Sequence, residues 1–203
     1  MLIPWLNLII LQIATLLFGY LYILSVMPAT RAEKRGEKAW KECKLLRSIS
    51  AIFMLVMLLN MILWIWYPIP ELAWPVHPDR LVGIIIGVAL LIPCTVVWIL
   101  GVKAAGGESM TPSRETQMYG GIYNHIRHPQ TLGEFPWYVV CALFINSLFL
   151  VLWSLIFILV YTPIMIHFEE KDLVKRFGEA YREYQQRTGA LFPKIRKQQT
   201  RND

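Results

Sequence analysis

The stretch 81-LVGIIIGVALLIPCTVVWIL-100 contains twenty consecutive residues without a charge. A helix of about 20 apolar residues is long enough to cross the hydrocarbon core of a bilayer. Further apolar runs lie at 2–27, 48–67 and 148–167, and a shorter one lies at 131–145. These runs predict an all-α integral membrane protein with about five transmembrane helices, of which the last two form a hairpin.

The composition agrees with this prediction and limits the classes of partner. Hydrophobic residues make up 56% of the 203 residues and charged residues only 17%, whereas soluble domains have about 25% charged residues. The length suits one membrane domain, 1–203. The net charge of +6 comes from basic residues that flank the apolar runs. We therefore expect membrane lipids as partners and no nucleic acid.

The cysteines and histidines do not indicate a metal site. Cys43, Cys94 and Cys141 are far apart in the sequence, and zinc sites usually have closely spaced ligand pairs. His125 and His128 lack a third ligand at a suitable spacing. We therefore expect no bound metal, and we interpret the cysteines as small buried side chains.

The charged loops set the expected orientation in the membrane. The segment 31–47 contains seven Lys or Arg residues and three Glu residues, and such basic loops stay on the cytoplasmic side. The loop 68–80 contains four prolines, Trp74 and one Lys or Arg residue, as expected on the opposite side. Counting crossings, we expect the N-terminus outside and the polar segments 101–130 and 168–203 in the cytoplasm.

The second of these polar segments carries a helical pattern. Leu173, Phe177, Tyr181 and Tyr184 recur at the spacing of one helix face within strongly charged sequence. This pattern predicts one amphipathic C-terminal helix on the cytoplasmic side, which ends before Gly189.

A G-x-x-x-G pattern lies inside the run 81–100, at Gly83 and Gly87. Small residues at this spacing let two membrane helices approach closely. The second helix can belong to the same bundle or to another copy of the chain. The pattern leaves two alternatives, a monomer and a dimer through the Gly83/Gly87 face.

The predicted hairpin brings two polar segments together, because it leaves and re-enters the same face of the membrane. One segment carries Arg127 and His128, and the other carries Glu169, Glu170 and Arg187. Ionisable groups at a membrane boundary are candidates for function. Taken singly, they are equally explained as interfacial anchors or as charges that favour a helix end.

The segment 121-GIYNHIRHPQTLG-133 resembles the G-x-Y-x-x-x-R-H-P-x-Y-x-G signature of the isoprenylcysteine carboxyl methyltransferase and phospholipid methyltransferase family. Glu169–Glu170, 177-FGEAYREY-184 and 187-RTGALFP-193 are similar to the rest of that signature, in the same order. The resemblance covers the chain from Gly121 on. Thr131 departs from it, because the family usually has an aromatic residue there.

The resemblance implies S-adenosyl-L-methionine as the methyl donor, held between the two polar segments. We expect Arg127 or His128 to bind its carboxylate, and Glu169 or Glu170 to bind its ribose and ammonium groups. Tyr123, Leu191 and Phe192 are candidates for a wall against the adenine. The full set of predicted cofactor-binding residues is Gly121, Tyr123, Arg127, His128, Pro129, Gly133, Glu169, Glu170, Leu191 and Phe192.

The resemblance further implies a lipophilic acceptor that enters from the bilayer. We expect the carboxylate of a prenylcysteine-like molecule, oriented by Arg127 and Arg187. A phospholipid ethanolamine is an alternative, and its amine would need a base such as Glu134 or Glu170. An NADPH-dependent reductase of the sterol reductase type and a non-enzymatic protein on the same scaffold are two further alternatives.

Overall fold

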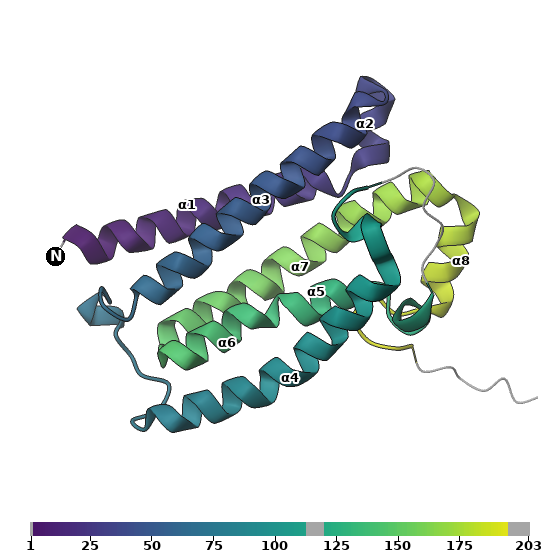
Figure 1. Ribbon diagram of the computed structural model, residues 1–203. Helices are drawn as coiled ribbons and strands as arrows, with labels where there is room; N and C mark the ends of the chain where they lie inside the picture. Colours follow the sequence, from purple (N-terminus) through teal and green to yellow (C-terminus); the bar gives the residue numbers. More distant parts are fainter. Residues whose placement is uncertain (1, 113–119, 195–203) are drawn as a thin grey trace, which may run out of the picture.

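The computed structural model describes residues 2–112 and 120–194, and it confirms the all-α membrane fold (Figure 1). Within these ranges, four helices are long and apolar enough to cross a bilayer. They are α1 (Leu2–Ser25), α3 (Lys38–Leu63), α4 (Arg80–Ala105) and α7 (Leu148–Phe177). The connecting elements are α2 (Pro28–Arg35), η1 (Pro70–Leu72), η2 (Gly106–Ser109), η3 (Gly121–Asn124), α5 (Pro129–Glu134), α6 (Pro136–Ile145) and α8 (Glu179–Arg187).

The run 131–145, predicted as one transmembrane helix, is divided between α5 and α6. Pro136 begins α6, and a proline has no N–H to continue the hydrogen-bond ladder of the preceding helix. Neither piece alone is long enough to span, so four single helices of the described residues have the length of a crossing, and α5 with α6 together occupy the place of the fifth predicted span. The pair α5–α6 still packs along α4 (Figure 1), and α6 with α7 forms the expected hairpin.

Glycines allow this close packing of α4 against α5 and α6. A Cβ atom added at Gly83 would lie 2.7 Å from the main-chain oxygen of Leu143, and one added at Gly87 would lie 2.5 Å from the ring of Phe144. Both glycines are buried within the chain. Of the two roles predicted for the G-x-x-x-G pattern, the structure shows packing inside the bundle.

The predicted amphipathic C-terminal helix is in fact two helices. Leu173 and Phe177 lie at the end of α7, whereas Tyr181 and Tyr184 lie on α8. Gly178 separates the two helices with a φ of 62°, a region that residues with a side chain rarely adopt. The turn folds α8 back toward η3, which lies at the same end of the bundle (Figure 1).

An aromatic cluster joins the N-terminal helices to the hairpin. Phe18 of α1 lies 5.8 Å from Tyr161 of α7, and Phe135 lies at the same distance from Tyr161, measured between ring centroids. The Tyr161 hydroxyl donates to the main-chain oxygen of Gly19 at 3.2 Å. Aromatic pairs contribute about 0.5–1.5 kcal/mol beyond the area they bury. This cluster therefore fixes α1 against α7 below the polar end of the bundle.

A buried carboxylate fixes α2 to α7 at that polar end. Asp172 is 1% exposed and accepts hydrogen bonds from the backbone N–H groups of Ala29 at 3.1 Å and Thr30 at 2.6 Å. The first N–H groups of a helix have no partner inside the helix. Asp172 therefore acts as the N-terminal cap of α2, although it lies more than a hundred residues away in the chain.

We predict that Asp172→Ala lowers stability, because it leaves two backbone N–H groups of α2 without acceptors. The expected loss is about 1–2 kcal/mol, measured as a lower Tm of the detergent-solubilised protein. The exposed Glu183 on α8 provides the control, since Glu183→Ala removes an acid without a buried contact. Equal Tm values for the two variants would contradict the capping role.

Candidate functional site

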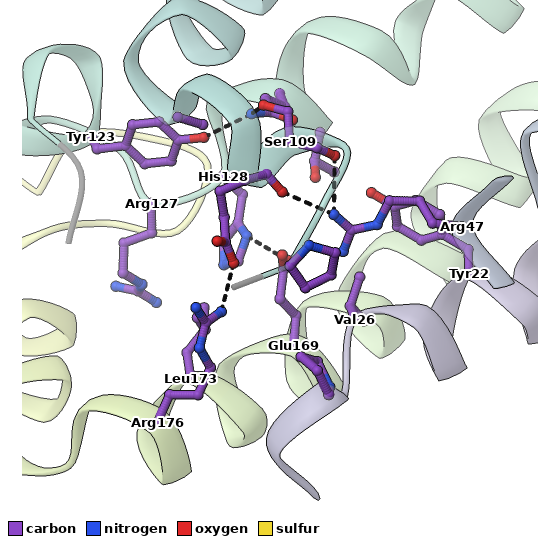
Figure 2. A pocket seen from close by; sticks show the side chains of 16 residues that line it. Tyr22, Val26, Arg47, Ser109, Tyr123, Arg127, His128, Glu169, Leu173 and Arg176 are labelled. Atoms are coloured by element: carbon purple, nitrogen blue, oxygen red, sulfur yellow. Dashed lines mark hydrogen bonds and ion pairs between the residues drawn. The ribbon is translucent and has the colours of Figure 1, made fainter. Parts of the chain in front are cut away.

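A pocket opens at the polar end of the bundle, where α1, α3 and α7 meet the segments that connect α4 to α5 (Figure 2). It contains about 710 Å³ of space between atoms, part of it open to solvent. The residues that line it are Tyr22, Val26, Pro28, Arg47, Ala105, Glu108, Ser109, Pro112, Tyr123, Arg127, His128, Gln130, Thr131, Glu169, Leu173 and Arg176.

His128 lies between two carboxylates on one side of this pocket. Its Nδ1 is 3.0 Å from Glu169 and its Nε2 is 3.0 Å from Glu170. Burial alone lowers the pKa of a histidine, but the hydrogen bonds to both carboxylates outweigh it and raise the pKa of His128 to about 9. At neutral pH the ring is therefore a cation that donates from both nitrogens.

Arg127 joins the segment before the hairpin to the segment after it. Its Nε donates to Glu170 at 2.6 Å, and its Nη1 donates to the main-chain oxygens of Gln185, at 3.1 Å, and Thr188. With its guanidinium bound to these partners, the side chain is only 9% exposed. The predicted meeting of Arg127 and His128 with Glu169 and Glu170 is confirmed.

Backbone hydrogen bonds strengthen the same junction. The N–H groups of Arg127 and His128 donate to the carbonyl of Ala190 at 3.1 and 3.0 Å, and Ile126 forms a parallel bridge with Gly189. These bonds resemble a short piece of a parallel β-ladder, in which the two segments are held in a fixed alignment. The main chain around Arg127 is therefore held in place by residues 189–190.

Two tyrosines and a glutamine complete the junction. The hydroxyl of Tyr184 on α8 donates to the main-chain oxygen of Tyr123 at 2.5 Å, and Gln185 donates to Glu170 at 2.8 Å. Burial raises the pKa of Tyr184 to about 12 and also raises the pKa of Tyr123. Both hydroxyl groups thus remain protonated and neutral at physiological pH.

Several pocket residues lie outside the segments that the sequence indicated. Tyr22 comes from α1 and Arg47 from α3, and those helices were expected only as membrane spans. Gln130 lies inside the R-H-P signature and donates to Ser109 at 2.8 Å and to Tyr123 at 3.1 Å. In the sequence, Arg47 is the last basic residue of segment 31–47, which indicated the cytoplasmic side of the membrane but not a pocket.

Only some of the predicted cofactor-binding residues line this pocket. Tyr123, Arg127, His128 and Glu169 line the pocket, as does Thr131, the departure from the family signature. Glu170 lies behind them, bound to Arg127 and His128. Phe192, at 74% exposed, lies outside the pocket. The others that do not line it are Gly121, Pro129, Gly133 and Leu191, and their contact with a cofactor stays a prediction.

The remaining predicted catalytic residues also lie away from this pocket. Arg187 is exposed and lines a separate surface pocket with His125 and Lys194. Glu134 lies deeper in the bundle, beside Trp98, at the end of α5. The structure thus brings together Arg127 and Glu170 of the predicted catalytic set, and it does not bring Arg187 or Glu134 to them.

Comparisons with known proteins agree with methyl-transfer chemistry. Residues 80–180 match the sequence model of the family described as phospholipid methyltransferase. The chain is 28% identical to the methanethiol S-methyltransferase of Pseudomonas deceptionensis, over 86% of this chain and 71% of the relative. It is 27% identical to methanethiol S-methyltransferase 1 of Bradyrhizobium diazoefficiens, over 84% and 64% of the two chains. No solved structure is significantly similar to it.

The raised pKa of His128 predicts a pH-dependent stability. The folded protein holds the proton up to about pH 9, whereas an unfolded histidine loses it near about 6.5. The stabilisation, on the order of 3 kcal/mol, is therefore complete below about pH 6.5 and is lost as the pH rises to about 9. We expect the Tm difference between wild type and His128→Asn to shrink over that range, and a constant difference would contradict a protonated ring.

A second variant separates packing from cofactor binding at Gly133. A Cβ atom there would lie 2.5 Å from the backbone nitrogen of Trp98 and 2.6 Å from the oxygen of Cys94. Because neither backbone atom can move freely, we expect Gly133→Ala to cost about 1–3 kcal/mol. The loss should appear in the Tm of the protein without any ligand. An unchanged Tm with weaker cofactor binding would favour the cofactor role.

Proposed function

Since the chain belongs to the isoprenylcysteine carboxyl and phospholipid methyltransferase family of integral membrane methyltransferases, we propose that it transfers a methyl group from S-adenosyl-L-methionine to a small lipophilic thiol. The reaction class follows from the family. The observation that carries the choice of donor is the pocket in which Glu169 and His128 face the same space as Arg47.

The residues of the pocket suit this donor. S-adenosyl-L-methionine has an adenine, a ribose diol and an amino acid end that carries both charges. Glu169, whose side chain is 28% exposed, would accept from the diol or the ammonium group, because a carboxylate only accepts hydrogen bonds. Tyr22 and Tyr123 provide aromatic surface along the pocket. When bound, the donor supplies a methyl group that its sulfonium activates.

The relatives support a thiol as the acceptor, because three of them are named methanethiol S-methyltransferases. A thiol attacks as its thiolate, and a neighbouring cation lowers the pKa of a thiol. The acceptor sulfur forms a bond to the methyl carbon while the carbon–sulfonium bond breaks, and the thiol proton passes to water. The products are a thioether and S-adenosylhomocysteine.

The chain's own part in this reaction is alignment. Holding two reactants in line can supply roughly 7–11 kcal/mol of a barrier, and a transfer of methyl to a thiolate needs no further base. Arg127 has a positioning role in this scheme, because its guanidinium is already bound to Glu170 and to main-chain oxygens. Apolar side chains of Val26 and Leu173 line the rest of the pocket, where a lipophilic acceptor would enter.

We also place the pocket on the cytoplasmic face, with the N-terminus of α1 on the other side. This orientation rests on the basic segment 31–47, which lies at the same end of the bundle as the pocket. Seven Lys or Arg residues in a short loop favour retention on the cytoplasmic side.

A methyl-transfer assay tests the proposed reaction. The full chain in lipid nanodiscs would be incubated with S-adenosyl-L-methionine and either methanethiol, a farnesylcysteine analogue or phosphatidylethanolamine. We expect dimethyl sulfide and S-adenosylhomocysteine in equal amounts from methanethiol. Transfer only to the farnesylcysteine carboxylate or to the phospholipid amine would replace the thiol as acceptor, and no transfer to any of the three would contradict methyl transfer itself.

A variant at Glu169 tests the donor site separately. We expect Glu169→Gln to weaken binding of S-adenosylhomocysteine by about tenfold or more, since a hydrogen bond to a charged group contributes roughly 1.5–3 kcal/mol. Calorimetric titration of the solubilised protein measures this change. Glu183→Gln, which changes an exposed acid on α8, is the matched control. Identical affinities for the two variants would remove Glu169 from the donor site.

A further inference from the structure

Three arginine side chains, Arg47, Arg127 and Arg176, line the pocket, and their hydrogen-bond partners differ in charge. Arg127 pairs with Glu170 at 2.6 Å, and Arg176 pairs with Glu108 at 2.8 Å. Arg47 instead donates from Nη1 to two main-chain oxygens, at 3.1 and 3.0 Å. Because a carbonyl dipole does not neutralise a full positive charge, Arg47 brings a guanidinium charge to the pocket that its protein hydrogen bonds leave unbalanced.

The same contacts hold Arg47 in a fixed position. The two oxygens belong to Glu108 and Ser109 of η2, so the side chain connects α3 to the end of α4. Within the described part of the chain, its Nε is buried without a hydrogen-bond acceptor. Its Nη2 also makes no hydrogen bond within this part of the chain, and unlike Nε it is not fully buried. An unpaired buried donor costs about 1–3 kcal/mol or more when it is charged.

These two nitrogens lie on one edge of the guanidinium. Nε and Nη2 present parallel N–H groups that match the two oxygens of a carboxylate. In Figure 2, Arg47 and Tyr22 approach the pocket from one side, with Glu169 between them and Arg127. A ligand that carries a carboxylate beside an ammonium group would therefore find a cation and an anion of the protein in the same pocket.

We infer that Arg47 is a cofactor-binding residue that holds the α-carboxylate of the methyl donor through Nε and Nη2. This inference rests on the proposed function and assigns the two charges of the donor's amino acid end, with the ammonium group at Glu169. Arg127 and His128, which were expected to bind the carboxylate, already have carboxylate partners within the protein. Arg47 lies outside residues 80–180, the part of the chain that matches the family.

The test compares two ligands that differ by one carboxylate. S-adenosylhomocysteine and S-adenosyl-3-thiopropylamine share the adenosine, the thioether and the amine, but only the first has a carboxylate. Each would be titrated calorimetrically into the solubilised full chain. We expect Arg47→Gln to weaken binding of S-adenosylhomocysteine by about 10- to 100-fold, and to change binding of the amine by no more than about threefold, the spread expected when no contact is lost.

Two further variants complete the experiment. Lys44→Gln removes an exposed cation one turn earlier on α3, and it should leave both affinities unchanged. Arg47→Lys keeps the charge but loses the two parallel donors, so we expect a smaller loss that is again confined to S-adenosylhomocysteine. If Arg47→Gln fails to fold, it will lose binding of the amine as well. Arg47→Lys then decides whether Arg47 binds the carboxylate.

The outcomes separate the inference from the function on which it rests. Equal weakening of both ligands in Arg47→Lys and Arg47→Gln would assign Arg47 a purely structural role and overturn the inference. Unchanged binding of S-adenosylhomocysteine in both variants would overturn it as well. A wild-type protein that binds neither ligand would contradict the proposed methyl donor itself.

Discussion

The pocket depends on the hydrogen-bonded junction between residues 126–128 and residues 188–190. Backbone N–H groups of Arg127 and His128 donate to the Ala190 carbonyl, while the Arg127 side chain donates to Glu170 and to the carbonyls of the α8 end. The junction holds the main chain at His128, whose ring lies between Glu169 and Glu170.

The electrostatics of the pocket follow from the way in which its charges are paired. Ion pairs removed from water are stable only when hydrogen bonds satisfy both partners, and His128 meets this condition with two carboxylates. Glu170 in turn receives hydrogen bonds from Arg127 and Gln185. On this side of the pocket, the positive charges of Arg127 and His128 are thus balanced by the carboxylates of Glu169 and Glu170. On the other side Arg47 contributes a cation whose protein partners are neutral carbonyls.

The sequence predicted the parts of the fold that depend on local composition. Uncharged runs located the four long helices, and the return of the hairpin to one face correctly placed Arg127 beside Glu170. The cap at Asp172 and the contribution of Arg47 could not be predicted, because each depends on helices distant in the sequence. A signature motif also does not show whether a residue packs or binds. Gly133 lies against the backbone of α4, and its predicted contact with the cofactor stays a prediction.

The junction at residues 188–190 also has a consequence for the order in which the chain is made. During synthesis, α1 to α6 and the R-H-P segment are translated before α8. The amides of Arg127 and His128 can pair with the Ala190 carbonyl only after that last segment has been translated. A nascent chain that stalls before this point lacks the partners that these two amides have in the folded protein. The junction therefore forms only after the C-terminal helix has been made and released.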